Sequence, residues 1–144
     1  MYSGNHKQIT GDFAEHLTMY WLSKEGYECI HARHIGIDII ASKEGKRMGI
    51  SVKARSRKPN ETNFGYTVLK PYNHLQNINK ACEDFNCSGY FSFVLDQQGL
   101  IRVYLVSVAS VLKYYNPSSD TKNQEWKINK FINDSELNTN LNWR

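Results

Sequence analysis

Two runs of alternating apolar and polar residues dominate the hydrophobic pattern of the chain. They are residues 36–41 (Gly-Ile-Asp-Ile-Ile-Ala) and 48–54 (Met-Gly-Ile-Ser-Val-Lys-Ala), separated by a short polar turn that contains Gly45. Such a pair of runs predicts an antiparallel β-hairpin. Because side chains alternate along a strand, we expect Ile37 and Ile39 on one face of the hairpin and Asp38 on the other.

The register of this hairpin follows from its turn. With Glu44 and Gly45 at the tip, Asp38 lies directly opposite Ser51, and Lys53 is a diagonal neighbour on the same face. A slip by one residue would separate the apolar residues of the two strands, so the pattern disfavours it. The hairpin is therefore expected to gather a carboxylate, a hydroxyl and an ammonium group.

The region before the hairpin predicts a helix over residues 11–24, which follows a flexible lead-in at residues 1–8. Thr10 is the expected N-cap, and Asp12 lies in the first turn, where a carboxylate favours the helix dipole. The expected buried stripe consists of Phe13, Ala14, Leu17, Tyr20 and Trp21. Glu15 lies outside that stripe, and periodicity alone makes it a surface residue.

The remaining elements alternate between strands and helices. We expect strands at 27–33, 88–96 and 100–106, a long polar loop at 55–70, and helices at 72–85 and 107–115, the last capped by Ser107. These predict a mixed α/β class around one sheet, in a single domain over 1–144. Its core spans about 10–115, and the C-terminal extension 116–144 adds an edge strand or a capping arm.

Composition narrows the class further. The 144 residues contain 40% hydrophobic side chains, typical of a folded globular protein. The chain has no apolar run of membrane-spanning length and no secretory signal, so we expect a cytoplasmic protein. Cys29, Cys82 and Cys87 form an odd set without CxxC spacing, which favours neither a disulfide framework nor a zinc site.

The formal net charge of +4 is modest, but the positive charge is concentrated around the hairpin. The basic residues there are Lys43, Lys46, Arg47, Lys53, Arg55, Arg57 and Lys58. Such a patch suits contacts with nucleic-acid phosphates. The alternative is a hairpin edge that lysines and arginines protect from aggregation.

Glu15 in the first helix, Gly36-Ile37-Asp38 in one strand and Ser51-Val52-Lys53 in the next resemble the PD-(D/E)xK nuclease superfamily. That superfamily includes restriction endonucleases and archaeal Holliday junction resolvases. The resemblance covers roughly residues 10–96. It implies a restriction endonuclease-like core of order αβββαβ, with a mixed central sheet flanked by helices.

The same resemblance implies a metal-dependent endonuclease that hydrolyses phosphodiester bonds in DNA. Asp38 and Glu15 would bind Mg²⁺, with Mn²⁺ as a substitute, and Val52 would add its backbone carbonyl. Lys53 would orient the attacking water and counter developing charge. The basic residues that would contact the DNA backbone are Lys46, Arg47, Arg55, Arg57 and Lys58. We expect a homodimer, because cutting both strands is simplest with two subunits.

Ser51 departs from the superfamily pattern, which usually has an acid at that position. Three explanations stay open: Glu15 supplies the missing charge, one metal ion suffices with Ser51 holding a metal-bound water, or metal binding is lost. The last makes the chain a catalytically inactive nucleic-acid-binding domain.

Two alternative interpretations of the sequence involve no nuclease site. Asp38 and Lys53 could form a plain cross-strand ion pair. A protein-interaction module is the third functional hypothesis, and its partner surface would consist of Tyr114, Tyr115, Trp126 and Trp143.

Overall fold

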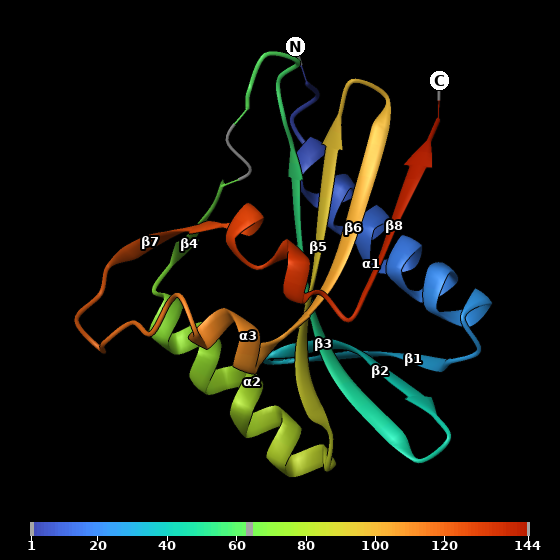
Figure 1. The fold of residues 1–144 in the computed structure, drawn as a ribbon, viewed down its shortest axis with the longest axis vertical. Coiled ribbons are helices and arrows are strands. Elements are labelled where there is room, and N and C mark those ends of the chain that lie inside the picture. Colours follow the sequence, from blue (N-terminus) through green and yellow to red (C-terminus); the bar gives the residue numbers. More distant parts are fainter. Residues whose placement is uncertain (1, 63–64, 144) are drawn as a thin grey trace.

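The structure is a computed structural model that describes residues 2–62 and 65–143 (Figure 1). Its elements in chain order are α1 (His6–Lys24), β1 (Glu28–His34), β2 (Ile37–Lys43), β3 (Lys46–Ser56), β4 (Gly65–Leu69), α2 (Pro71–Phe85), β5 (Ser88–Gln97), β6 (Leu100–Ser107), α3 (Val108–Leu112), β7 (Asn123–Lys127), the 3₁₀ turns η1 (Ile128–Lys130) and η2 (Ile132–Asp134), and β8 (Leu137–Asn142). The expected αβββαβ order is present, with β4 added between β3 and α2.

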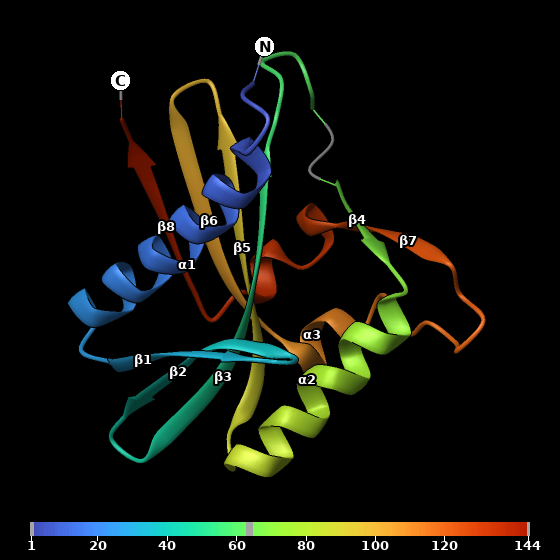
Figure 2. The same cartoon turned by 180° about the vertical axis from the view of Figure 1, so that it is seen from behind.

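Six strands form one mixed sheet in the order β1-β2-β3-β5-β6-β8. Neighbouring strands are antiparallel except β3 and β5, which are parallel. A parallel pair needs a long crossover, and here β4 and α2 supply it. The central strand β3 therefore has β2 and β1 on one side and β5, β6 and β8 on the other (Figure 2).

The sheet packs between two apolar cores. On one face α1 covers a cluster that includes Ile39, Met48 and Ile50. On the other face α2, α3 and the C-terminal segment cover Ile37, Phe91, Phe93 and their neighbours. Figure 2 shows α1 crossing its face of the sheet while α2 lies lower, beside the hairpin. No helix among the described residues is both long and apolar enough to span a bilayer.

Helix α1 differs from its prediction at its start and on its buried face. It begins at His6, so the last three residues of the segment expected to be flexible are helical, and Thr10 lies inside the helix with its hydroxyl bonded to the His6 carbonyl. Phe13 and Tyr20 are 47% and 63% exposed. The residues that α1 does bury are Ala14, Thr18, Trp21 and Leu22. Small Ala14 and Thr18 allow a close approach, and the Thr18 hydroxyl lies 2.9 Å from that of Ser92 in β5.

The register predicted for the β2–β3 hairpin is confirmed from Ile39–Ile50 to Lys43–Lys46. The shared face predicted for Ile37 and Ile39 is wrong, because Ile37 packs in the α2-side core and Ile39 in the α1-side core. The cause lies just before β2: the β1–β2 register shifts between His31 and His34, and Gly36 has a φ of 95°.

The 55–70 segment is more regular than its composition indicated. β3 continues to Ser56, and β4 pairs with β7 in a separate two-stranded sheet. The C-terminal extension also supplies β8, which pairs with β6 at the edge of the main sheet and confirms the expected edge strand. Trp126 and Tyr115 are buried, so half of the hypothetical aromatic partner surface is core.

Candidate functional site

Asp38 lies at the start of β2, where the hairpin ladder ends. The last regular pair is Ile39–Ile50, and beyond it the Val52 amide donates a 2.8 Å hydrogen bond to Oδ2 of Asp38. The Asp38 carboxylate thus takes the place of a backbone carbonyl as the acceptor for the Val52 amide. The direct pairing of Asp38 with Ser51 that the register predicted is not part of the ladder. Burial raises the pKa of Asp38, and the nearby charge of Glu15 raises it further, while the Val52 bond and Lys53 act in the opposite direction.

Glu15 reaches the same place from α1. Its Oε1 lies 2.5 Å from Nε2 of His31, which comes from β1. Both side chains are about one-fifth exposed, at 22% and 20%. Since Glu15 and His31 each influence the pKa of Asp38, three elements bring a carboxylate pair and an imidazole together.

Lys53 approaches from the α2 side of β3. Burial lowers the pKa of its ammonium group, and the neighbouring Asp38 carboxylate opposes that shift. Its Nζ lies 3.1 Å from Nδ1 of His74, in the first turns of α2. An ammonium group can only donate, so Nδ1 accepts and His74 is neutral. Burial and the charge of Lys53 both lower the pKa of His74, which is consistent with that protonation state.

Ser51 is 8% exposed and pairs in register with Phe91 of β5. It occupies the position at which the sequence resemblance implies an acid. Within residues 2–62 and 65–143, no group of three or more His, Cys, Asp or Glu side chains is arranged to hold a metal ion. The serine thus leaves Asp38 and Glu15 as the carboxylates of the cluster.

The donor set nevertheless suits a hard cation. Mg²⁺ binds through one or two carboxylates and keeps several waters. In a ladder, a residue directs its N–H and C=O toward the same neighbouring strand, so the Val52 carbonyl faces the β2 side together with the amide that binds Asp38. A cation here would also offset the repulsion that raises the pKa of Asp38. Asp38, Glu15 and the Val52 carbonyl therefore fit a magnesium site.

The residues of the predicted basic patch lie in different surroundings in the structure. Lys46 forms an ion pair with Glu136 and lies over the Tyr90 ring, and Arg47 donates to the Phe85 carbonyl at 3.1 Å. Both lie at the hairpin tip, and at about 3.3 Å per residue Lys46 is roughly 20 Å along β3 from Lys53. The two residues are thus not placed to contact the same phosphate as the cluster.

Arg57 was also expected to contact the DNA backbone, but its side chain has another role in the structure. Its side chain is buried, donates to the Gly65 carbonyl at 2.9 Å and pairs with Glu61 at 2.9 Å. The guanidinium therefore holds the loop between β3 and β4 together and is not available for a DNA phosphate. Arg55 and Lys58 remain exposed, and the Arg55 guanidinium lies 4.8 Å above the Tyr66 ring.

A groove of about 760 Å³ extends from Lys53 along the end of β3. Its floor is β3, one wall is the N-terminal half of α1, and the other wall is β4 with His74 of α2. We call this the β3 groove. Its lining residues are Tyr2, His6, Lys7, Thr10, Gly11, Val52, Lys53, Ala54, Arg55, Ser56, Tyr66, Thr67, Val68, Leu69 and His74. The cluster and the groove are continuous, because they share Val52 and Lys53.

Sequence reasoning singled out Glu15, Asp38 and Lys53, and the structure brings all three together. It missed His74, whose position at the start of a helix gave no chemical signal, and it did not assign His31 to the site. His34 points elsewhere and packs edge-on against Phe85. The groove wall formed by Tyr2 and Lys7 was missed because that segment has no apolar periodicity.

Comparison with solved structures shows what the architecture is similar to. The Holliday junction resolvase Hjc of the archaeal hyperthermophile Archaeoglobus fulgidus superposes with a TM-score of 0.62 over 87% of this chain and 88% of that chain, at 15% sequence identity. The chain has a restriction endonuclease-like fold. This confirms the fold class predicted from the sequence.

A second similar structure is the bacterial homing endonuclease I-Ssp6803I, with a TM-score of 0.45, 13% identity, and coverage of 83% of this chain and 77% of that one. No protein-family model and no curated protein sequence matches the chain.

Proposed function

We propose that the protein is a metal-dependent endonuclease that hydrolyses phosphodiester bonds in DNA. One observation carries the proposal: Glu15, Asp38 and Lys53 come from α1, β2 and β3 and meet beside Val52 at the end of the β3 groove. Two carboxylates and a partly buried ammonium group are the side chains that phosphodiester hydrolysis with a divalent cation requires. The fold shared with Hjc supports the proposal.

Asp38 and Glu15, with the Val52 carbonyl, would hold Mg²⁺ or Mn²⁺. The bound ion would neutralise phosphate charge and lower the pKa of a water molecule. Lys53 donates to the phosphate oxygen or to the attacking water and counters charge in the transition state. His74 accepts from Nζ of Lys53 and so fixes the direction of its other protons. His31 holds the Glu15 carboxylate toward Asp38.

The proposed substrate is DNA whose structure, more than its sequence, determines cleavage. Helices α1 and α2 both pack on the sheet through buried faces, and neither is presented as a recognition helix for the major groove. Arg55 and Lys58 would contact the backbone. Cutting both strands of a branched DNA would use two copies of the site, so we propose a homodimer. We also propose that the protein acts in the cytoplasm.

Nicking of supercoiled plasmid tests the proposal. We expect the native protein to nick with Mg²⁺ or Mn²⁺ and not with EDTA, and Asp38→Ala to lose at least about a hundredfold in rate. Asp120→Ala is the matched control, since Asp120 is exposed and outside the site. Absence of cleavage by the native protein on plasmid, branched and single-stranded DNA with either ion would refute the nuclease proposal.

A second candidate function is a catalytically inactive nucleic-acid-binding domain. Ser51 favours it, because it removes one carboxylate from the usual ligand set. This candidate predicts salt-dependent DNA binding that is unchanged by EDTA and never accompanied by cleavage. The plasmid assay and a binding titration on the same samples separate the two.

A further inference from the structure

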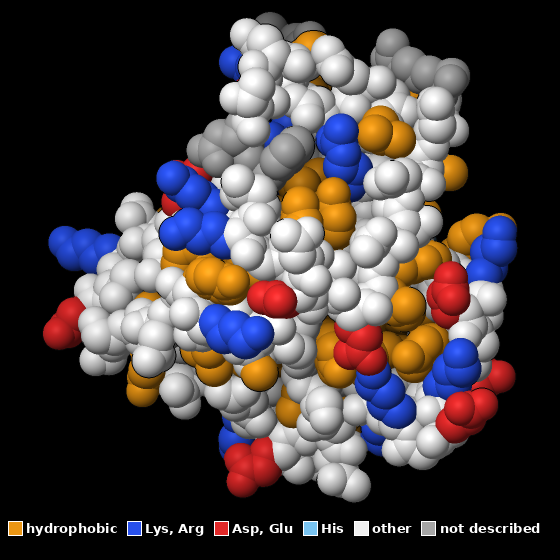
Figure 3. Space-filling model, viewed as in Figure 1, with side chains coloured by type: hydrophobic (Ala, Val, Ile, Leu, Met, Phe, Trp, Pro, Cys, Tyr) orange, Lys and Arg blue, Asp and Glu red, His pale blue; other side chains and the backbone are white. Residues whose placement is uncertain are grey.

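The β3 groove is electrostatically one-sided. Its described lining residues include Lys7, Lys53, Arg55 and two histidines, and none of them is an Asp or Glu. The opposite face of the molecule differs, since Lys and Arg side chains there are interspersed with Asp and Glu (Figure 3). A row of cations without acids between them suits the regularly spaced phosphates of one DNA strand.

The groove also presents aromatic surfaces on both walls. On the α1 side, the Tyr2 ring stacks on His6 with centroids 4.1 Å apart, and Tyr2 is 63% exposed. On the β4 side, the Arg55 guanidinium covers Tyr66 at 4.8 Å. Exposed aromatic rings and arginine planes are the groups on which unpaired bases stack. Paired bases inside a duplex cannot reach such side chains without leaving the stack.

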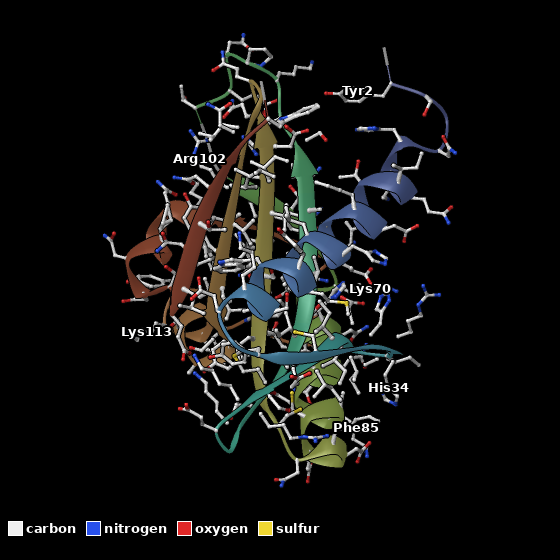
Figure 4. All side chains as sticks on the ribbon, turned by 90° about the vertical axis from the view of Figure 1, so that its right-hand side faces the viewer. Tyr2, His34, Lys70, Phe85, Arg102 and Lys113 are labelled. Carbon is white, nitrogen blue, oxygen red and sulfur yellow. The ribbon has the colours of Figure 1, made fainter. Side chains whose placement is uncertain are left out.

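The size of the groove favours a single strand. Its volume of about 760 Å³ is in the range of small-ligand sites. A short run of nucleotides of one strand fits such a volume. Figure 4 shows Tyr2 and Lys70, the N-cap of α2, on one side of the strands in that view, while Arg102 and Lys113 lie on the other.

We propose that the β3 groove binds an unpaired DNA strand that leads away from the Asp38–Lys53 cluster. Lys7 and Arg55 contact the phosphates, and Tyr2 with His6 and Tyr66 with Arg55 stack on the bases. This inference rests on the proposed nuclease function and specifies its substrate as DNA with a single-stranded arm. Selectivity for DNA with an unpaired arm then follows, because only such an arm can enter the groove.

Binding in EDTA tests the groove independently of cleavage. Fluorescence anisotropy compares a labelled oligothymidylate with a blunt hairpin duplex of equal length. We expect tighter binding of the single strand, and an affinity loss of about tenfold in Tyr2→Ala. The matched control is Tyr20→Ala, because Tyr20 is equally exposed and lies in α1 outside the groove lining.

The contribution of positive charge to binding is tested by Lys7→Gln. The control is Lys113→Gln, because Lys113 lies on the other side of the strands from Tyr2 (Figure 4). Lys7→Gln should reduce the salt slope of single-strand binding by about one, and Lys113→Gln should leave it unchanged. Equal binding of duplex and single strand, or equal losses in Tyr2→Ala and Tyr20→Ala, would overturn the groove assignment. Those outcomes leave the nuclease proposal standing, since plasmid nicking measures it separately.

Discussion

Asp38 is held in a position that is unfavourable for its charge. Burial and the Glu15 carboxylate raise its pKa, although the Val52 amide donates to it. An acid whose pKa is higher in the folded than in the unfolded state costs stability once it is ionised. Such a cost is typical of residues that a ligand or reaction requires.

We therefore predict that Asp38→Asn raises the melting temperature in EDTA at neutral pH while abolishing DNA cleavage. Asparagine keeps an oxygen for the Val52 amide and removes the buried charge. The folded protein binds a proton at position 38 more readily than the unfolded chain does, so the advantage of the variant should shrink as pH falls through the titration of Asp38. Scanning fluorimetry checks this, and a lower melting temperature for the variant would contradict it.

Lys53 and His74 form the other distinctive pair, with Nζ and Nδ1 3.1 Å apart. His74→Leu removes the acceptor that directs the ammonium group, whereas His74→Asn retains one. We predict that the Leu variant lowers kcat about tenfold with little change in KM, and that the Asn variant recovers part of the loss. Single-turnover cleavage of an oligonucleotide measures both, and equal rates for His74→Leu and the native protein would contradict a positioning role.

Among the elements, β2 has a start that helix backbone constrains closely. Gly36 has a φ of 95°, and a Cβ built there would lie 2.2 Å from the Asn77 carbonyl oxygen of α2. That oxygen belongs to helix backbone and cannot move aside cheaply. Gly36 therefore sets the close approach of β2 to α2, two residues before Asp38.

We predict that Gly36→Ala destabilises the protein by about 3 kcal/mol and strongly lowers cleavage. The matched control is Gly45→Ala, because Gly45 also has a positive φ, 82°, but no atom lies within 4 Å of its added Cβ. The control should cost only the backbone strain of about 1–2 kcal/mol and keep its activity. Chemical denaturation measures both, and equal losses would show that contact with α2 is unimportant.

The sequence predicted those elements whose signal is local. The β2–β3 register, helix α2 and the β5–β6 pair each follow from periodicity and from a turn within the same segment. β4 and β7 were missed because each is completed by a partner about 60 residues away, as in the Tyr66–Trp126 pair. The buried face of α1 was misjudged because Thr18 is polar, and its hydroxyl finds Ser92 only in the folded sheet.

The same division holds for the candidate site. The sequence was sufficient to predict Glu15, Asp38 and Lys53 as site residues, because their spacing along the chain carries the resemblance to the nuclease superfamily. His74 could not be predicted in this way, because its meeting with Lys53 depends on how α2 crosses the sheet. Arg57 looked like part of the basic patch, and only the folded loop shows that Glu61 and Gly65 engage it.

In the whole molecule, the sheet separates two different surfaces. The cluster and the β3 groove lie where α1, β3, β4 and α2 meet, and the far face carries mixed charge (Figures 2 and 3). Under the proposed function, the groove, whose described lining contains no Asp or Glu, would lead a DNA strand to the carboxylates proposed to bind metal. The proposed nuclease function therefore depends on whether those carboxylates bind a divalent cation despite Ser51.

Calorimetric titration with Mn²⁺ measures that property directly. We predict saturable binding by the native protein and by the control Asp120→Ala, and at least a tenfold weaker association for Asp38→Ala. The loss should run parallel to the loss of plasmid nicking. Binding of Mn²⁺ that is equally strong in Asp38→Ala, or absent from the native protein, would contradict a metal-dependent nuclease site at Asp38.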